Sequence, residues 1–389
     1  MKTIWILGAG ASKAHNSGMP AINEFFSIAQ ELGIINHSNN NFPLLKKYIE
    51  DSFGKNILDD NVKLDIEKVL TNIEIDIDKS DSVKFFTAKQ EVLKLIKEVF
   101  NGLSKGLENQ NGKYNIFING NKNFDGIMPS DTILSFNWDL LLDNIFERRK
   151  ILKPSYKEGE LPPQSVKNKV DNNQYYKMAY ELSALKGCVR YSNVFPPYEK
   201  YDNSKGYYLK LHGSIDWLYC SNKSCKGFGK NFPVLNYHKK HFCSECNKEL
   251  NYLIIPPVLN KQYDTYPFID KIWNIASKEI ETAKRIIIWG YSLPNTDFYS
   301  DWLLRQARDS VEELILINPE CIINSINGKK AWNHEFINKF FNIFKPNLNQ
   351  INKEFKFDIY EYFTDFMNSN PIYKKYSYLK KEKSNSKDQ

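Results

Sequence analysis

The chain has 389 residues, of which 42% are hydrophobic and 25% are charged. This composition is ordinary for a globular protein, and the length suits one large or two moderate domains. The net charge of +7 would favour nucleic acid, but six lysines against two acids in residues 374–389 supply +4 of it. Such a terminus is typical of a solvated tail, so we expect no direct binding of nucleic acid.

The sequence predicts no membrane span, because no stretch approaches about eighteen uninterrupted apolar residues. The N-terminal stretch MKTIWILGAG contains an apolar run that is too short for a signal peptide. We therefore expect a first β-strand there and a cytoplasmic protein.

Six short apolar runs each end in a polar or glycine-rich turn. They are Ile4–Leu7 before GAGAS, Ile133–Phe136 before NWD, Tyr208–Leu211 before HGS, Leu253–Ile255 before PP, Ile286–Trp289 before GYSLP, and Leu314–Ile317 before NPE. Continuous apolarity is typical of strands that are buried on both faces. With helical patterns between them, the runs predict an α/β fold, namely a doubly wound parallel Rossmann-like sheet with a ligand cleft along the carboxyl ends of its strands.

Several segments interrupt this pattern. Residues of about 25–128 are mainly helical in pattern, as in SVKFFTAKQEVLKLIKEVFNGL, and predict a helical insertion. Residues of about 150–206 are polar and rich in Lys, Asn, Tyr and Pro, which predicts a variable insertion of loops or a partner surface. We expect one α/β domain over 1–325, an extension of helix, strand and helix over 326–375, and a disordered tail over 376–389.

The first motif is ILGAGASKAHNSGMP, in which a strand runs into GAGAS and then into a helix. Glycines permit a tight turn and close approach to a phosphate, and a helix N-terminus attracts that anion. Lys13 stands where the dinucleotide fingerprint has its third glycine, and no acidic residue ends a second strand about 20 residues later. This argues against an ordinary dehydrogenase. Phosphate or dinucleotide binding is favoured over a turn without a ligand, through Gly8, Ala9, Gly10, Ala11 and Ser12.

Two further motifs place polar side chains at strand ends. In SFNWDLLLDNIFE, Asn137 and Asp139 either cap a helix or are delivered to a ligand cleft by a parallel strand. In KLHGSIDW, His212 follows an apolar run. A lone histidine is more often structural than catalytic, but the position at a strand end favours a general base.

The cysteines form the pattern C-x4-C, seventeen residues, then C-x2-C, which is typical of a four-thiolate zinc ribbon. Such a site has no open position, so the Zn²⁺ would be structural, in a module of about 218–250. A disulfide interpretation conflicts with a cytoplasmic chain. His238 or His241 could replace a cysteine, but we expect both to be exposed to solvent. The predicted ligands are Cys220, Cys225, Cys243 and Cys246.

The last two motifs are IIIWGYSLPNTD and LILINPE. Gly290 and Ser292 could approach a phosphate through backbone and hydroxyl, while Asn318 and Glu320 could bond ribose hydroxyls. Each motif alone is weak, since strand ends often carry turn residues.

In this order the motifs resemble the sirtuin family, specifically its bacterial SIR2-like branch, from Lys2 to Glu320. GAGAS with GMP, which contains Pro20, is similar to the family's NAD loop, and SFNWD to its Gln-Asn-Ile-Asp segment. LHGS resembles the catalytic histidine segment, and the cysteine set resembles the zinc module. GYSL is similar to the Gly-Thr-Ser-Leu phosphate loop, and INPE to the Asn-x-Glu site for the adenosine ribose.

The resemblance implies roles for three side chains in NAD+ cleavage. Asn137 would hold the nicotinamide ribose and a water near its anomeric carbon, Asp139 would lie near the nicotinamide amide, and His212 would act as the base on a ribose hydroxyl. It also implies an NAD-degrading effector of bacterial anti-phage defence, some of which work with a HerA-type ATPase or an Argonaute-like protein. Unrestrained NAD loss would kill the host, so we expect activity to be gated by such a partner or by a homo-oligomer.

The sequence departs from sirtuin deacylases at two places. Deacylases continue Gly-Ile-Pro with Asp-Phe-Arg, whereas Ala21, Ile22 and Asn23 follow here. The stretch LIIPPVLNK has two prolines where deacylases pair a Phe-Gly-Glu segment with the peptide, and proline cannot donate that backbone hydrogen bond. We therefore expect a NAD+ glycohydrolase. A protein deacylase and a non-catalytic subunit that binds NAD or ADP-ribose remain the alternatives.

Overall fold

The structure of the chain is a computed structural model. It describes residues 2–16, 18–38, 40–59, 62–80, 82–104, 112–128, 130–148, 179–181, 206–228, 231–233, 241–243, 245–256, 267–295, 297–324, 330–344, 355–368 and 373–374. Most of the variable insertion predicted over 150–206, and the whole tail predicted over 376–389, lie outside these residues.

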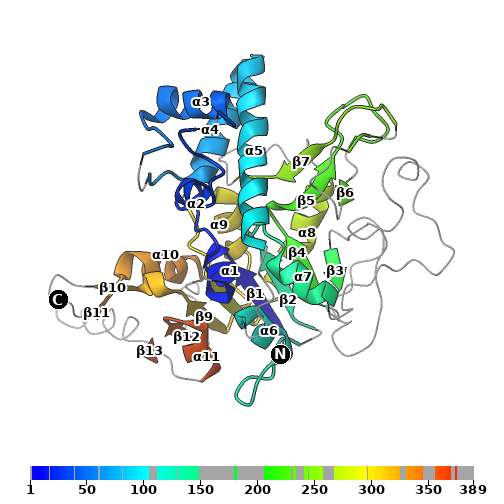
Figure 1. Cartoon of the computed structure of the whole chain (residues 1–389). Helices are drawn as coiled ribbons and strands as arrows, with labels where there is room; N and C mark the ends of the chain where they lie inside the picture. The colour runs from blue at the N-terminus through cyan, green and yellow to red at the C-terminus, as the bar shows by residue number, and fades with distance from the viewer. Residues whose placement is uncertain are drawn as a thin grey trace, which may run out of the picture.

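In the part of the chain that the structure describes, the main sheet has eight strands in the order β13-β12-β9-β8-β1-β2-β4-β3 (Figure 1). Neighbouring strands from β12 to β4 are parallel, and the edge strands β3 and β13 are antiparallel. Numbered along the chain, the parallel strands have the order 3-2-1-4-5-6, which is the order of sheets that bind dinucleotides. The prediction of a parallel α/β sheet is confirmed. The bounds are β1 Thr3–Leu7, β2 Thr132–Ser135, β3 Ala179–Glu181, β4 Tyr207–Lys210, β8 Arg285–Trp289, β9 Glu313–Ile317, β12 Lys356–Tyr360 and β13 Tyr373–Lys374.

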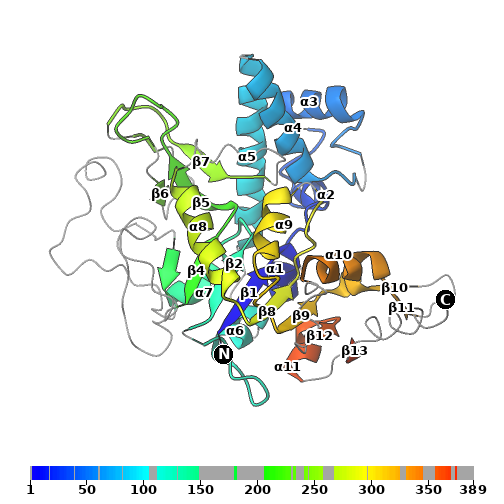
Figure 2. The same ribbon diagram turned by 180° about the vertical axis from the view of Figure 1, so that it is seen from behind.

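Helices cover both faces of this sheet because alternate side chains of each strand point to opposite sides. Ile4 and Ile6 of β1 pack into one core with α8 (Pro267–Glu281), α9 (Phe298–Arg305) and α10 (His334–Phe344). Trp5 and Leu7 pack into the other core with α1 (Ala9–His15), α6 (Lys113–Asn119), α7 (Leu141–Arg148) and α11 (Phe363–Met367). Figures 1 and 2 show the two helical layers from opposite sides.

Between β1 and β2 the chain forms the helices of the predicted insertion. They are α2 (Phe25–Glu31), α3 (Pro43–Phe53), α4 (Ile66–Lys79) and α5 (Val83–Ser104), followed by α6. Their apolar faces meet in a separate core that also includes Trp138 and Ile215 of the α/β domain. This shared core holds the insertion above the carboxyl ends of the strands (Figure 1).

A small antiparallel sheet, in the order β6-β5-β7, stands beside the insertion. Its strands are β5 (Gly213–Tyr219), β6 (Asn231–Pro233) and β7 (Asn251–Ile254). The prediction that the run Leu253–Ile255 belongs to the parallel sheet is therefore wrong. Three apolar residues do not distinguish the two sheet types, and here Leu253 and Ile254 are buried by different cores on the two faces of β7.

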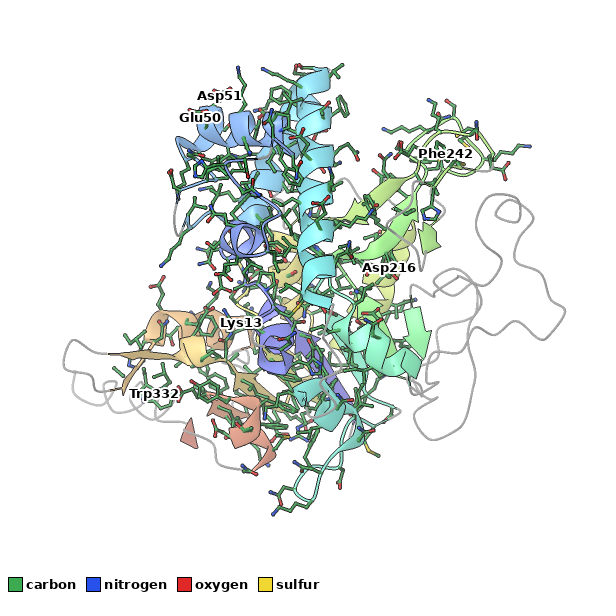
Figure 3. The ribbon with its side chains drawn as sticks, in the orientation of Figure 1. Lys13, Glu50, Asp51, Asp216, Phe242 and Trp332 are labelled. Atoms are coloured by element: carbon green, nitrogen blue, oxygen red, sulfur yellow. The ribbon has the colours of Figure 1, made fainter. Side chains whose placement is uncertain are left out.

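After β9 the chain turns through a 3-10 helix, Pro319–Cys321, into the pair β10 (Ile322–Asn324) and β11 (Lys330–Trp332). It continues as α10, β12 and α11, so β12 joins the main sheet beside β9. Figure 3 shows Trp332 in this region, far from Phe242 on the cysteine loops. Among the described residues, no helix is both long and apolar enough to cross a bilayer.

Candidate functional site

Five neighbouring strands carry a predicted site residue just beyond their carboxyl ends. In sheet order they are β4, β2, β1, β8 and β9, followed by His212, Asn137, Gly8, Gly290 and Asn318. At a strand spacing of about 4.8 Å, these ends span roughly 19 Å. All five residues line one cavity of about 500 Å³, a size common for ligand pockets. It lies across the point between β1 and β8 where the strand order reverses, the usual ligand position in such sheets.

This cavity collects every predicted catalytic and nucleotide-binding residue except Ala11. Its lining includes Gly8, Ala9, Gly10, Ser12, Pro20, Asn137, Asp139, His212, Gly290, Ser292, Asn318 and Glu320. Ala11 is instead fully buried in the core beneath α1, because its position on that helix faces the sheet. Asp65, Ile66 and Glu67 at the start of α4 also line the cavity, although no motif predicted them.

The floor of the cavity is backbone. Gly290 has φ +65°, and a Cβ at this position would lie 2.2 Å from the amide nitrogen of Ala11. A Cβ on Gly8 would lie 2.5 Å from the carbonyl oxygen of Gly290. The N–H of Gly10 donates to that same oxygen at 2.9 Å. The two loops after β1 and β8 therefore touch through main-chain atoms, an approach that needs glycine.

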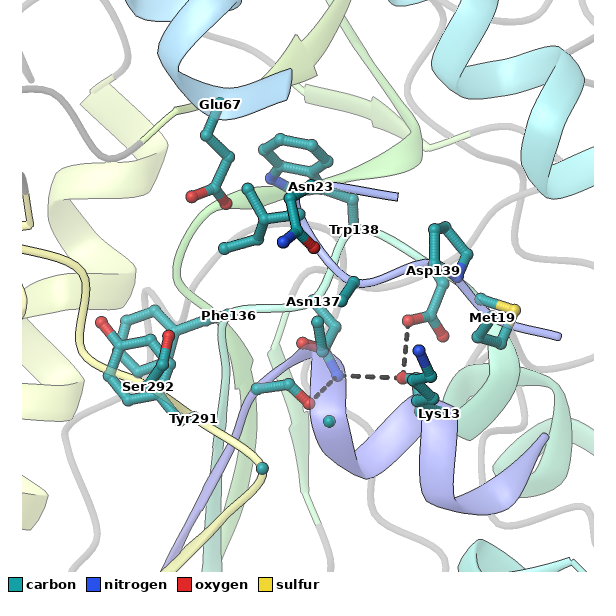
Figure 4. A pocket seen from close by; sticks show the side chains of 18 of the residues that line it. Lys13, Met19, Asn23, Glu67, Phe136, Asn137, Trp138, Asp139, Tyr291 and Ser292 are labelled. Atoms are coloured by element: carbon teal, nitrogen blue, oxygen red, sulfur yellow. Dashed lines mark hydrogen bonds between the residues drawn. The ribbon is translucent and has the colours of Figure 1, made fainter. Parts of the chain in front are cut away.

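Asn137 is held by hydrogen bonds from its amide nitrogen (Figure 4). Nδ2 donates to the carbonyl oxygen of Gly8 at 2.9 Å and to Oγ of Ser12 at 3.0 Å. The Ser12 hydroxyl in turn donates to Oδ2 of Asp139 at 2.7 Å. With the nitrogen bound to protein, Oδ1 of Asn137 is the atom that would accept a hydrogen bond from a water or hydroxyl in the cavity.

Asp139 lies two residues before the first residue of α7 and also lines the cavity. Its Oδ1 accepts from the N–H of Leu141, the first residue of α7, while its carboxylate also lines the cavity. Burial raises the pKa of Asp139, and the charge of nearby Lys210 partly opposes that rise. The carboxylate is already engaged by Ser12 and Leu141, so its main effect is to fix the loop that carries Asn137.

Tyr114 completes the network, and sequence reasoning missed it. Its phenol oxygen lies 2.9 Å from Oγ of Ser12, and its ring stacks on His15 with centroids 5.1 Å apart. Burial and the nearby charge of Asp139 raise the pKa of Tyr114 well above its usual range, so the phenol stays neutral. In the sequence, Tyr114 is one of two aromatic residues on α6, the other being Phe117, and nothing distinguishes it from a core residue.

A buried lysine supports the same loop from below. Lys210, at the end of β4, is fully buried, and its Nζ donates to the main-chain oxygen of Asp139 at 2.6 Å. It also bonds Oγ of Ser214 at 2.8 Å and pairs with Asp143 at 3.1 Å. Burial raises the pKa of the neighbouring Asp216, labelled in Figure 3, to about 7. The Lys210 ammonium thus contacts the carboxylate of Asp143 and the loop that carries Asn137 and Asp139, and its charge also acts on Asp216.

His212 lies in an aromatic corner of the cavity. Its ring contacts Phe136 with centroids 4.9 Å apart, and Phe136 stacks on Tyr291 at 4.2 Å. Nε2 of His212 lies 3.2 Å from Oδ2 of Asp297. Asp297 belongs to the GYSLPNTD motif, where it has the pattern of a helix cap and no assigned role. The base candidate and a carboxylate are thereby brought together from distant segments.

The four cysteines form a separate cluster whose sulfur atoms all lie within 4.8 Å of one another. Sγ of Cys220 lies 3.7 Å from Sγ of Cys246, and the same distance joins Cys225 to Cys243. These separations are too long for disulfides, which need about 2.05 Å. They match the edges of a tetrahedron around Zn²⁺, which are about 3.8 Å for Zn–S bonds of about 2.3 Å. The cluster could therefore hold a metal ion such as zinc.

We expect purified protein to contain about one zinc per chain and Cys243→Ser to lose most of it, because three thiolates leave the tetrahedron open. Loss of the metal should cost several kcal/mol of folding free energy in this module. Metal analysis and thermal melting measure both effects. Cys321→Ala, which alters a buried cysteine outside the cluster, is the control and should keep the zinc. Full zinc in Cys243→Ser would contradict a four-thiolate site.

The histidine prediction in this module is wrong for His241, which is buried rather than exposed. Its main-chain oxygen accepts from the N–H of Leu250, which draws it under the loop. His238 lies outside the described residues.

A comparison with protein-family models found no match, and a comparison with curated proteins found none either. The function of the cavity is therefore inferred from the residues that line it.

Proposed function

We propose that the chain is a SIR2-like NAD+ glycohydrolase, which converts NAD+ and water into nicotinamide and ADP-ribose. The observation that carries the proposal is the series of five strand ends. A base candidate, an amide, two glycine-rich loops and a ribose-binding pair follow one another along a single cavity. An extended dinucleotide presents its groups in the same sequence, with a nucleoside at each end and a pyrophosphate in the middle.

The chemistry of each strand end suits one part of the substrate. The pyrophosphate would lie over the glycine backbone after β1 and β8, where Ser292 offers a hydroxyl; the ammonium group of Lys13 also lines the cavity but is paired with Glu24 at 2.6 Å. Asn318 and Glu320, beyond β9, would bond the adenosine ribose. The nicotinamide ribose would then lie at the other end, between Asn137 and His212. This orientation places the scissile bond in the aromatic corner.

Cleavage develops positive charge on the ribose as nicotinamide leaves. Asn137 would accept a hydrogen bond through Oδ1 from the attacking water, while His212 takes a proton from a ribose hydroxyl. The rings of Phe136, Tyr291 and Trp273 around the histidine would exclude other water. Water adds to the anomeric carbon as the bond to nicotinamide breaks, and it gives a proton to the deprotonated ribose oxygen. The proton on His212 is then released to solvent, so the products are nicotinamide, ADP-ribose and one proton.

We also propose that the activity is gated, as expected for an anti-phage effector whose reaction depletes the NAD+ of the host. Support for a surface comes from α9, where Phe298 and Trp302 are one turn apart and 55% and 51% exposed. The N-cap residue of this helix is Asp297, which contacts His212, so an oligomer contact or a HerA-type or Argonaute-like partner on α9 would act close to the base.

The purified full-length protein should consume NAD+ and release nicotinamide and ADP-ribose, identified by chromatography and mass. The assay is run alone, at rising protein concentration, and with the products of neighbouring genes. A parallel incubation with an acetylated peptide tests the deacylase alternative, which would release O-acyl-ADP-ribose. Binding of NAD+ without turnover under all conditions would overturn the hydrolase and leave a non-catalytic subunit.

A further inference from the structure

The contact between His212 and Asp297 joins two buried side chains from separate segments. His212 follows β4, and Asp297 is the N-cap residue of α9. Their side chains are 3% and 0% exposed, and Nε2 lies 3.2 Å from Oδ2. Phe136 contacts the imidazole at 4.9 Å and Trp273 stacks near it at 6.5 Å, so the ring has a defined plane.

Asp297 is fixed by further donors on both of its oxygens. Oδ2 accepts from the phenol of Tyr291 at 2.9 Å and from Oγ of Ser300 at 2.6 Å. Oδ1 accepts from the backbone N–H of Ser300 at 3.3 Å, which is the ordinary bond of a helix cap. Hydrogen bonds of this kind hold a carboxylate in one place and compensate its buried charge.

The two oxygens therefore have different tasks. Capping of α9 uses Oδ1, and the contact with His212 uses Oδ2. Asparagine caps helices as well as aspartate does, so capping alone does not require a carboxylate here. The contact with the imidazole does require a carboxylate. An ionised carboxylate only accepts hydrogen bonds, whereas an asparagine side chain can also donate them.

We propose that Asp297 is a positioning residue that keeps the proton of neutral His212 on Nε2 and directs Nδ1 to accept the substrate's proton. A neutral imidazole carries one proton, and a carboxylate next to one nitrogen fixes it there. In the proposed hydrolysis the ribose hydroxyl gives its proton to Nδ1. The imidazolium that forms is stabilised by Asp297, and no oxidant or further reactant is needed.

The role of Asp297 rests on the proposed function, because the hydroxyl that gives its proton to His212 is that of the NAD+ ribose. It also links the base to the loop of Ser292. Tyr291, whose phenol bonds Asp297, directly precedes that serine, and its ring stacks on Phe136. A ligand phosphate bound to this loop would therefore also restrain Tyr291 and Asp297, which orient His212.

The test uses Asp297→Asn, which keeps the cap but loses the negative charge. Asparagine can donate to Nε2 and shift the imidazole proton to Nδ1. We expect turnover of NAD+ to fall by about 10²–10⁴-fold with little change in NAD+ affinity. Ser300→Ala removes one bond but keeps the carboxylate, and should lose less than about tenfold.

The second readout does not depend on turnover. The chain has six histidines, so ¹⁵N-histidine labelling with His212→Gln as the assignment reference resolves the signal of His212. Wild type should show the proton on Nε2, and Asp297→Asn should move part of it to Nδ1. Thermal melting checks that both variants fold.

A wild-type His212 protonated on Nδ1 would overturn the inference, as would Asp297→Asn with unchanged tautomer and turnover. If Asp297→Asn does not fold, the tautomer of His212 in the wild type and the turnover of Ser300→Ala still test the role of Asp297. A tautomer shift in a protein that never turns over NAD+ would refute the hydrolase while supporting the positioning role.

Discussion

Asn137→Ala should abolish the hydrolysis of NAD+, with a loss of about 10³-fold or more. In the proposed mechanism the amide oxygen accepts a hydrogen bond from the attacking water, and the amide is held in place because Nδ2 bonds Gly8 and Ser12. Removing the side chain deletes the acceptor and leaves the Ser12 hydroxyl with a changed set of partners. The measurement is single-turnover NAD+ cleavage with product identification, run beside a direct NAD+ binding assay.

The matched control is Asn144→Ala, which removes an amide from the nearby helix α7 and should keep nearly full activity. Asn137→Asp adds a sharper test, since it keeps an oxygen toward the cavity but loses the donor to Gly8. It should bind NAD+ and turn it over slowly, because a carboxylate beside the Gly8 carbonyl is repelled from the position of the amide. Full turnover by the alanine variant would show that Asn137 does not orient the water.

Lys210→Met should destabilise the protein by about 3–5 kcal/mol, the usual cost of removing one partner of a buried ion pair. Methionine fills a similar volume but leaves Asp143 and the carbonyl of Asp139 without their cation. Urea unfolding measures the change. Lys47→Met, on the exposed side of α3, is the control and should stay within about 0.5 kcal/mol of wild type.

The destabilisation should also depend on pH. In the folded protein the pKa of Asp216 is raised to about 7, against an ordinary 3.8, and Lys210 opposes that rise. A carboxyl with a raised folded pKa favours folding most at low pH and loses that advantage as pH rises through the folded value. Without Lys210 the pKa rises further, so the gap between wild type and Lys210→Met should widen from pH 6 to pH 8. If the difference in stability did not depend on pH, Lys210 would have no effect on the pKa of Asp216.

The sequence is informative where local chemistry and strand geometry coincide. Apolar runs that end in polar residues locate β1, β2, β4, β8 and β9, and parallel strands necessarily bring those ends to one edge. For this reason the sequence alone could place Asn137 and His212 in one site, although they are 75 positions apart in the chain. The cysteine spacing also predicted that the four thiols would lie together, and the structure brings their sulfur atoms within 4.8 Å of one another.

The residues that sequence reasoning missed act through contacts that no local pattern encodes. Tyr114 reaches Ser12 only because α6 packs against α1. In the sequence Lys210 is a charged residue within an apolar run, and only the fold shows that Asp143 and Asp216 lie near it. The misplaced run Leu253–Ile255 had the right burial but the wrong sheet, because pairing partners are set by tertiary contacts.

The position of β1 in the middle of the sheet has a consequence for biosynthesis. β1 is translated before both of its neighbours, because it pairs on one side with β2 and on the other with β8, so that Thr3 lies beside Arg285. The cavity also needs Asn318 and Glu320, made later still. The ribosome must therefore translate as far as Glu320 before all walls of the cavity exist, and copies that stop earlier have no assembled site. For a protein proposed to destroy a vital metabolite, the order of translation is itself a safeguard.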